Sequence, residues 1–214
     1  MCGNGARCVA LFISAKRKAQ RPALNDRSAS RFLREVAKID IETKAGIIKS
    51  EVRDNFVKIK LTDPKGIKLD IPVKINNRTI RVNFINTGVP HTVIFVEGLQ
   101  TIDVKKLGSL IRYHRIFAPA GTNVNFVEVT DNQAIKIRTY ERGVEAETLA
   151  CGTGTVAAAL VTSYKLQTNG EDKINVYTQG KEVLKVYFNK TGSKFFDVWL
   201  QGKAECVFNG KITF

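Results

Sequence analysis

Apolar and polar residues alternate along most of the chain, with the two-residue period of β-strands. The alternating runs are separated by glycine, by Asp54-Asn55 and by the turn sequence DPKG at residues 63–66, which are typical strand boundaries. Hairpin turns are predicted at Gln179-Gly180 and Gln201-Gly202. The predicted strands lie near residues 38–46, 47–52, 55–63, 68–75, 78–86, 92–96, 124–129, 134–140, 173–179, 182–189, 195–201 and 204–208.

Three other stretches have the composition and spacing of helices. Residues 6–20 place apolar side chains at helical spacing after a glycine turn, and a short helix is predicted near residues 104–113. Residues 151–167 have the small and apolar side chains of a buried helix. Many antiparallel strands with few helices indicate an α+β fold. The chain has 214 residues, 43% of them hydrophobic, which is enough for one large core or two modest ones.

The two longer helices begin with the same motif. CGNGARCVAL at residues 2–11 and CGTGTVAAAL at residues 151–160 share Cys, Gly, Gly, Ala and Leu at identical offsets. One CGxG turn would be equally compatible with a small cysteine buried in a core. Two turns in register, each opening a helix, indicate two similar halves that each present a thiol at a helix N-terminus.

A cysteine in that position is suited to acid/base chemistry. The helix dipole is expected to lower the thiol pKa toward neutrality, and the free amides of the first turn can hold a carboxylate. Two such thiols on opposite sides of one carbon suit inversion, because one removes a proton while the other returns a proton to the opposite face. A hydrolase or transferase with a single cysteine nucleophile would need a partner histidine. His91 and His114 lie in no recognised signature and are interpreted as structural.

Charge and cysteine content further narrow the classes of function that the chain could have. The chain has 34 Lys and Arg against 20 Asp and Glu, a net charge of +14, but the basic residues are scattered and the densest cluster is KRKAQR at 16–21. A solvated basic surface is therefore favoured over a nucleic-acid interface. The four cysteines, without a CxxC pair and with only two histidines, favour neither a disulfide framework nor a metal site. No signal peptide or membrane-spanning run is recognised, so a cytoplasmic location with reduced thiols is expected.

On its motifs, the chain resembles the diaminopimelate epimerase family. The combination of YERG, ET and ACGTG is the specific part, since the related proline racemases and phenazine-pathway isomerases share the fold without it. The matching segments run through the chain in the family's order: MCGNGARC (1–8), ETKAGI (42–47), NTGVPHTVIFVE (86–97), GTNVNFVEV (121–129), TYERGVEAETLACGTG (139–154) and GKITF (210–214).

The resemblance implies two pseudo-symmetric α+β domains, each with a mixed sheet around a central helix, and an active site between them. Residues 1–64 with 205–214 are expected to form an incomplete N-terminal domain, and residues 65–204 the C-terminal domain. Cys2 and Cys151 are implied as the two acid/base residues. Gly3, Asn4, Gly152 and Thr153 would hold the reacting end of the substrate, and Asn123, Glu141 and Arg142 the distal amino and carboxylate groups.

The implied reaction is epimerisation of LL-diaminopimelate to meso-diaminopimelate, in the biosynthesis of lysine and peptidoglycan precursors. No cofactor, pyridoxal phosphate included, and no metal is expected. The expected partner is this small molecule, with neither nucleic acid nor a membrane, and a homodimer is left open. Adjacent Glu141 and Arg142 suit a substrate charged at both ends, because arginine can bind a carboxylate in bidentate fashion; an ordinary surface ion pair is the alternative.

The chain departs from the family pattern in three places. Members have a further segment before the MCGNG motif, with a GNDF-type loop, so Met1 looks like an internal methionine and N-terminal truncation is expected. Val89 stands in GVPH where many members have asparagine, and Asn86 or Thr87 is the expected substitute. Since Cys2 lies next to the amino terminus without its preceding strand, weak or absent activity is expected.

Two other functions stay open at this point. One is a racemase or epimerase of another amino acid, such as proline or hydroxyproline. The other is a non-catalytic protein, either a basic remnant or a binding module.

Overall fold

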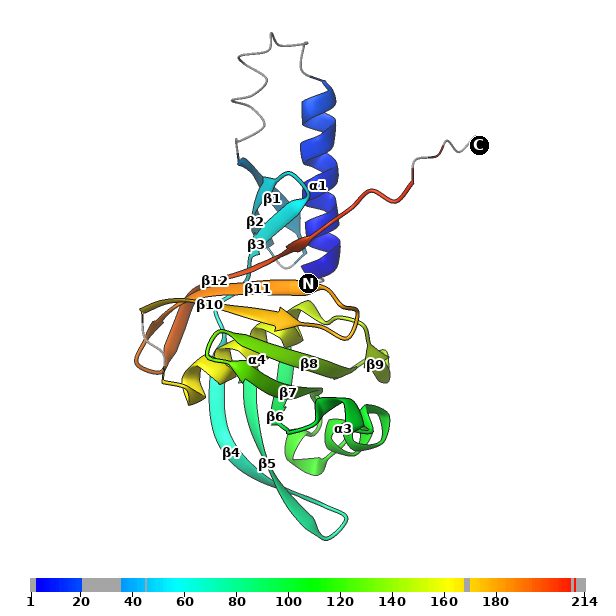
Figure 1. The fold of residues 1–214 in the computed structure, drawn as a ribbon, viewed down its shortest axis with the longest axis vertical. Coiled ribbons are helices and arrows are strands. Elements are labelled where there is room, and N and C mark those ends of the chain that lie inside the picture. Colours follow the sequence, from blue (N-terminus) through cyan, green and yellow to red (C-terminus); the bar gives the residue numbers. More distant parts are fainter. Residues whose placement is uncertain (1–2, 21–35, 45, 168–169, 209, 211–214) are drawn as a thin grey trace. The chain divides into compact units, whose positions relative to one another are not determined.

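The computed structural model describes residues 3–20, 36–44, 46–167, 170–208 and 210. It confirms the predicted α+β class, with many strands and few helices (Figure 1). The contacts divide the chain into two compact units: unit 1 comprises residues 1–60 and 201–214, and unit 2 comprises residues 61–200. The sequence placed its domain boundaries four residues later, after residues 64 and 204.

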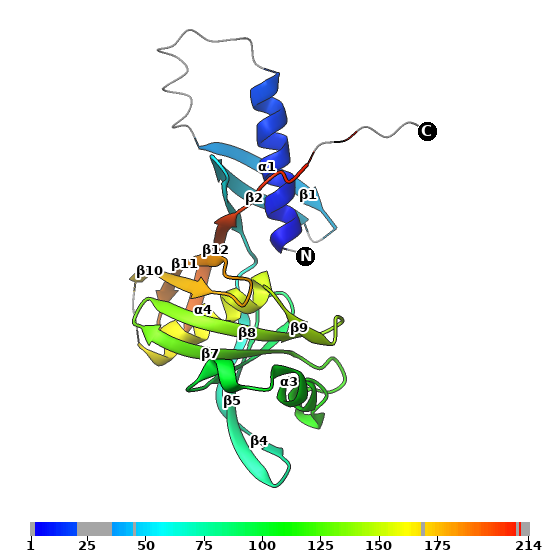
Figure 2. The ribbon, with the colours of Figure 1, turned by 45° about the vertical axis from the view of Figure 1, so that its right-hand side comes forward.

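The described part of unit 1 contains an antiparallel meander of three strands and the helix α1. Strands β1 (Ala37–Thr43), β2 (Gly46–Arg53) and β3 (Phe56–Lys60) pair in antiparallel order. Helix α1 (Gly3–Ala19) packs against all three strands, and Figure 2 shows it beside β1 and β2. It buries Ala6, Ala10 and Ser14, which share one face because they are spaced four residues apart.

The described part of unit 2 is a mixed sheet with the helices α3 and α4. Its strands lie in the order β4-β5-β6-β7-β8-β10-β11-β12, and β9 pairs with β8. The pairs β6–β7 and β8–β10 are parallel, whereas the other registered pairs are antiparallel. The strands are β4 (Lys65–Ile75), β5 (Arg78–Asn86), β6 (Pro90–Phe95), β7 (Asn123–Asp131), β8 (Ala134–Glu141), β9 (Ala146–Thr148), β10 (Gly170–Tyr177), β11 (Val183–Thr191) and β12 (Lys194–Lys203).

Helix α4 (Gly152–Lys165) is the central helix of unit 2. It packs against β5, β6, β7 and β8 and also against β10 and β11. Every residue from Gly154 to Ser163 is buried. The small side chains of this helix explain its place, because a helix that strands cover on several sides has no room for a polar face.

Helix α3 (Val104–Arg112) packs on β7, β8 and β9. The Asp103 side chain caps it by accepting a hydrogen bond from the Lys106 amide (3.0 Å). Val104 and Ile111 contribute to a cluster with Phe126 and Tyr140. Two short 3₁₀ helices, η1 (Leu99–Thr101) and η2 (Arg115–Phe117), lie on either side of α3 in the chain.

The predicted helices and most predicted strands are confirmed, but the C-terminal prediction is wrong. Residues 201–202 do not form a hairpin turn, because β12 continues to Lys203. Residues 204–208 form no strand, and Val207 and Phe208 are 83% and 82% exposed. An alternating pattern becomes a strand only when a neighbour accepts its backbone hydrogen bonds, and of these five residues Ala204 donates to Asn55 (2.8 Å).

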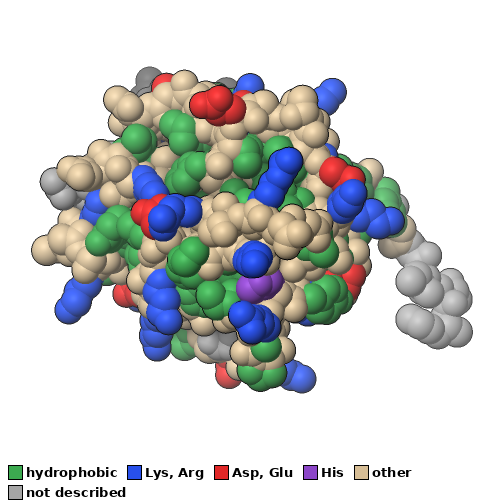
Figure 3. All heavy atoms as spheres, turned by 90° about the horizontal axis from the view of Figure 1, so that it is seen from below, with side chains coloured by type: hydrophobic (Ala, Val, Ile, Leu, Met, Phe, Trp, Pro, Cys, Tyr) green, Lys and Arg blue, Asp and Glu red, His purple; other side chains and the backbone are tan. Residues whose placement is uncertain are grey.

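The basic residues are dispersed on the surface that Figure 3 shows. On that face, lysine and arginine side chains lie between apolar and uncharged polar groups and do not gather in one patch. This agrees with the scattered distribution along the sequence. Among the described residues, no helix is long and apolar enough to cross a membrane.

Candidate active site at the start of α4

Cys151 occupies the N-cap position of α4. Its backbone is extended (φ −117°, ψ 112°), and its carbonyl accepts the first helical hydrogen bond, from the Thr155 amide (2.8 Å). The side chain is 8% exposed, and its Sγ lies 3.6 Å from Thr153 Oγ1. The structure therefore confirms that a thiol lies at the beginning of a buried helix.

The glycine at position 154 allows α4 to approach β7 closely. A Cβ atom there would overlap Asn125 Oδ1 and lie 3.3 Å from Cys151 Sγ. Asn125 is fully buried, and its Oδ1 accepts a hydrogen bond from Thr139 Oγ1 (3.1 Å). Its Nδ2 donates to the Thr92 carbonyl (3.0 Å). Gly154 and Asn125 thus determine how closely α4 and β7 approach each other beside the Cys151 thiol.

His91 belongs to the same buried network. Its Nδ1 lies 3.2 Å from Asn125 Nδ2, and since that amide nitrogen is a donor, Nδ1 acts as acceptor and Nε2 carries the proton. Nε2 has no hydrogen-bond partner within the described residues. Burial, and secondarily the charge of Arg142, lowers the pKa of His91 from 6.5 to about 3. His91 is therefore neutral at physiological pH.

The pKa of Cys151 is shifted in the direction opposite to the sequence-based expectation. Burial raises it most, and the charge of Glu141 raises it further. The Thr153 hydroxyl and the amides of Gly154 and Thr153 lower it, but their effect is smaller. The predicted lowering by the helix N-terminus is therefore wrong as a net effect, because desolvation of the thiolate outweighs the helix amides.

The three residues predicted to bind the distal end of the substrate come together in unit 2. Glu141 ends β8, and its Oε2 accepts a hydrogen bond from Thr148 Oγ1 (3.0 Å). The Arg142 amide donates to Asn123 Oδ1 (2.8 Å), and its Nη1 donates to the Ala120 carbonyl (3.0 Å). These contacts connect the end of β8 with the start of β7.

Asn123 is 4% exposed and serves as the link between three strands. Its Oδ1 accepts from Arg142, and its Nδ2 donates to the Pro90 carbonyl at the start of β6 (3.0 Å). It therefore orients the backbone of Arg142. Its predicted contact with a substrate stays a prediction.

The segment with Val89 also lies at the start of α4. Thr87 Oγ1 donates to the Thr153 carbonyl (3.1 Å), whereas Asn86 Oδ1 accepts from the Gly88 amide (2.9 Å) within its own turn. Of the two substitutes considered for the missing asparagine, Thr87 is the one that contacts the helix start.

The remaining predicted site residues belong to unit 1. Cys2 lies outside the described residues. Gly3 is buried at the beginning of α1, and Asn4 Oδ1 accepts a hydrogen bond from Arg7 Nη2 (3.1 Å). In the described parts of the chain, no group of three His, Cys, Asp or Glu side chains is arranged to hold a metal ion.

Sequence reasoning missed Asn125 and treated His91 as an isolated structural histidine. The available signal was weak: each is a polar residue among both polar and apolar neighbours, in TNVNFV and PHTVIF. Such residues are buried only when they are hydrogen-bonded, and this pattern alone does not show what they contact.

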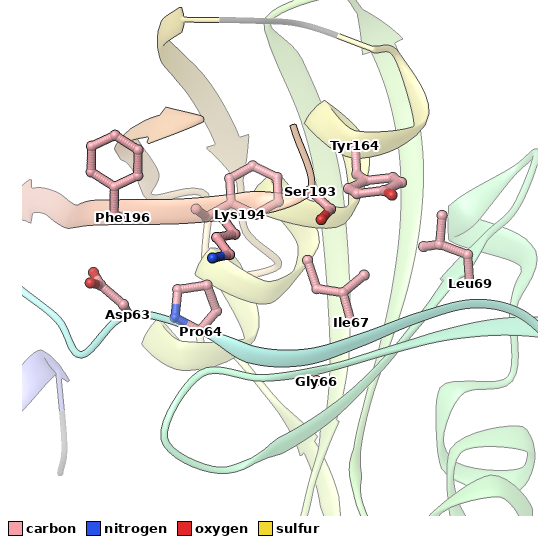
Figure 4. A pocket seen from close by; sticks show the side chains of 10 residues that line it. Asp63, Pro64, Gly66, Ile67, Leu69, Tyr164, Ser193, Lys194 and Phe196 are labelled. Atoms are coloured by element: carbon pink, nitrogen blue, oxygen red, sulfur yellow. The ribbon is translucent and has the colours of Figure 1, made fainter. Parts of the chain in front are cut away.

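A separate cavity of about 730 Å³ lies at the other end of α4 (Figure 4). Asp63, Pro64, Ile67, Tyr164 and Lys194 line it, together with other residues around the beginning of β4 and the turn between β11 and β12. None of the residues around Cys151 contributes to it, so it is not part of the candidate site.

Comparison with known proteins identifies a family. The model of the family described as diaminopimelate epimerase matches residues 83–207. The chain is 40% identical to the diaminopimelate epimerases of Hydrogenobaculum sp. and Aquifex aeolicus, covering 100% of this chain and 70% of each relative. It is 35% identical to that of Chlorobaculum tepidum, covering 100% of this chain and 75% of the relative.

Solved structures share the fold at lower sequence identity. A hydroxyproline epimerase from Agrobacterium vitis superposes with a TM-score of 0.68 at 16% identity, over 95% of this chain and 63% of that one. A phenazine biosynthesis protein from Bacillus anthracis gives a TM-score of 0.61 at 18% identity, over 82% of this chain and 68% of that one.

Proposed function

Because this chain belongs to the diaminopimelate epimerase family, we propose that it interconverts LL- and meso-diaminopimelate, with Cys151 as one of two acid/base thiols. The observation that carries the proposal is the position of Cys151. Its thiol lies at the N-terminus of a buried helix, in the same unit as the adjacent residues Glu141 and Arg142.

The proposed chemistry is a proton exchange at one α-carbon. A thiolate takes the α-proton and forms an S–H bond, while the C–H electron pair moves onto the α-carbon and its carboxylate. The thiol of the second cysteine then gives its proton to the opposite face and becomes the thiolate. The internal repeat and the family resemblance support Cys2 as that second thiol.

The residues around Cys151 have distinct roles in this proposal. The free amides at the start of α4 stabilise the negative charge that develops on the substrate carboxylate. The raised pKa keeps Cys151 as a thiol at neutral pH, so in this state it is the proton donor. Arg142 binds the distal carboxylate and Glu141 the distal ammonium group.

The proposed setting follows from this chemistry. Both thiols must be reduced, which favours the cytoplasm, and the product would serve the synthesis of lysine and of peptidoglycan precursors. The proposed partner is the small-molecule substrate alone.

The test is deuterium incorporation at the α-carbon of LL-diaminopimelate in D2O, followed by NMR under reducing conditions. We expect slow but detectable incorporation with the unaltered chain and none with Cys151→Ala. Cys206→Ser is the matched control, because it removes a thiol that is exposed in unit 1, and it should leave the exchange unchanged.

Parallel assays with proline and trans-4-hydroxyproline separate the alternative substrates. Neither carries a second amino acid group, so the distal residues have no partner in them. Exchange with these two and not with diaminopimelate would contradict the proposal, as would a folded chain that exchanges none of the three.

A further inference from the structure

The turn at residues 141–145, which contains Arg142, is stabilised by the Glu145 side chain within it. The Glu145 amide donates to the Glu141 carbonyl (2.8 Å), and Glu145 Oε1 accepts a hydrogen bond from the Gly143 amide (2.9 Å). Gly143 has φ +92° and Glu145 has φ +57°. A glutamate in the left-handed region is unfavourable by itself, so its side-chain contacts must stabilise this conformation.

Helix α3 supplies those contacts through its last residues. Arg112 Nη2 lies 3.2 Å from Glu145 Oε1, and the Arg112 side chain is only 14% exposed. The Arg112 guanidinium also stacks on the Tyr113 ring, 4.6 Å from its centroid. The Gly143 amide is the largest cause of a lowered pKa at Glu145, and hydrogen bonds from Tyr113 and Arg112 lower it further. The carboxylate is thus bound from the turn and from α3 together.

Arg112 also contacts residues 120–123, the segment that binds Arg142. Gly121, at φ +64°, packs so closely on Arg112 that a Cβ atom there would overlap its guanidinium and lie 2.8 Å from its carbonyl oxygen. The segment beside Gly121 provides the Ala120 carbonyl that Arg142 Nη1 binds, and Asn123, which binds the Arg142 amide. One arginine therefore lies against both segments that hold Arg142.

We propose that Arg112 and Glu145 are positioning residues that fix Arg142 and Asn123 for the distal end of a doubly charged substrate. The inference rests on the proposed function and adds two residues to it that do not touch the reacting carbon. An exposed ion pair without this role would contribute little to stability and nothing to recognition.

The kinetic test is Glu145→Gln, which keeps the size of the side chain and removes its charge. Because Arg142 would act on the end of the substrate that does not react, we expect KM for LL-diaminopimelate to rise about 10-fold and kcat to change less than about twofold. Arg112→Gln should give the same split. The double variant should be no worse than Arg112→Gln alone, since that variant has already removed the ion pair with Glu145.

The matched control is Glu147→Gln. Glu147 is an ion-paired carboxylate two residues further on, which binds Arg138 of β8 through two hydrogen bonds (2.7 and 2.8 Å). The Glu147→Gln variant should be less stable than the unaltered chain and have the same KM for LL-diaminopimelate. An equal rise in KM in this control would overturn the inference, because general loosening would then explain the effect.

A second measurement does not depend on catalysis. Amide hydrogen exchange of Arg142 and Gly143, followed by NMR in the full chain, should become at least about 10-fold faster in Glu145→Gln and stay unchanged in Glu147→Gln. Faster amide exchange with an unchanged KM would overturn the inference and leave the proposed function intact. An unaltered chain that neither binds nor exchanges diaminopimelate would overturn the proposed function, whatever the amides do.

Discussion

The two helices that share the CGxG motif lie in different surroundings. In α4, all residues from Val156 to Val161 are at most 1% exposed. In α1, Val9 is 43% and Phe12 is 62% exposed, although they occupy the repeat positions of Ala158 and Val161. Strands from two parts of the chain, β5–β8 and β10–β11, cover α4, whereas β1–β3 cover α1 within the described residues. The two copies of the motif therefore precede helices of different burial, and the neighbouring strands determine how much of each helix is buried.

The largest difference in stability between the two helices should appear on substitution of the leucine that the two repeats share. Leu160 is fully buried in α4 and Leu11 is half-buried in α1. We expect Leu160→Ala to reduce the free energy of unfolding of unit 2 by about 2–5 kcal/mol, and Leu11→Ala to cost unit 1 clearly less. Urea denaturation with hydrogen exchange in each helix measures both, and equal losses would contradict the comparison.

The second of the two glycines that the turns share, Gly5 in α1 and Gly154 in α4, should give the next largest difference in stability. Gly154→Ala brings a methyl group onto Asn125 Oδ1, and overpacking of this kind costs about 1–3 kcal/mol. Gly5 is exposed in α1, and Gly5→Ala should change stability by less than about 1 kcal/mol because alanine favours the helix. Thermal unfolding of each variant tests this, and a neutral Gly154→Ala would show that α4 does not need its close approach to β7.

The third expectation concerns pH and applies to unit 2 alone, because both histidines lie in it. Burial lowers the pKa of His91 to about 3, so below the unfolded value of 6.5 the unfolded state binds a proton that the folded state does not. Stability should therefore fall as the pH falls, by roughly 1 kcal/mol between pH 6.5 and 5.5.

His91→Gln removes this titration. Denaturation of the unaltered chain and the variant at several pH values separates the contribution of His91 from that of the carboxylates. An unchanged slope in the variant would mean that folding does not lower the pKa of His91.

The smallest effect concerns the thiols of the two helices. Cys8 is exposed on α1, whereas burial raises the pKa of Cys151. Iodoacetamide at pH 7 should therefore modify Cys8 before Cys151, as measured by peptide mass spectrometry. Glu141→Gln should accelerate the modification of Cys151 severalfold, because it removes a negative charge that raises this pKa. Slower modification in that variant would contradict the assigned effect of Glu141.

The periodic patterns were sufficient to predict most of the fold. The helix at 151–167 was recognisable because small residues and glycines leave it no polar face, and most predicted strands match the observed ones within a few residues. The strand predicted at 204–208 was wrong because a pattern of side chains does not show whether a pairing partner exists. The parallel pairing of β6 with β7 and of β8 with β10 depends on contacts distant in the sequence.

The sequence predicted only the part of the candidate site that lies in one contiguous segment. Cys151, Glu141 and Arg142 belong to a contiguous motif, so the sequence grouped them before the structure did. Arg112 and Asn125 come from other elements, and only the fold brings them to the site. The direction of the Cys151 pKa also depended on burial, which local sequence does not report.

The ribosome completes unit 2 before it can complete unit 1. Arg7 of α1 donates a hydrogen bond to the carbonyl of Lys203, 196 residues later in the chain, and unit 1 includes residues from both ends of the sequence. During synthesis, α1 and the strands β1–β3 therefore emerge first and wait for the end of β12, while all of unit 2 is made between them. Until Lys203 is made, the Arg7 side chain cannot form the hydrogen bond to its carbonyl that it has in the folded chain.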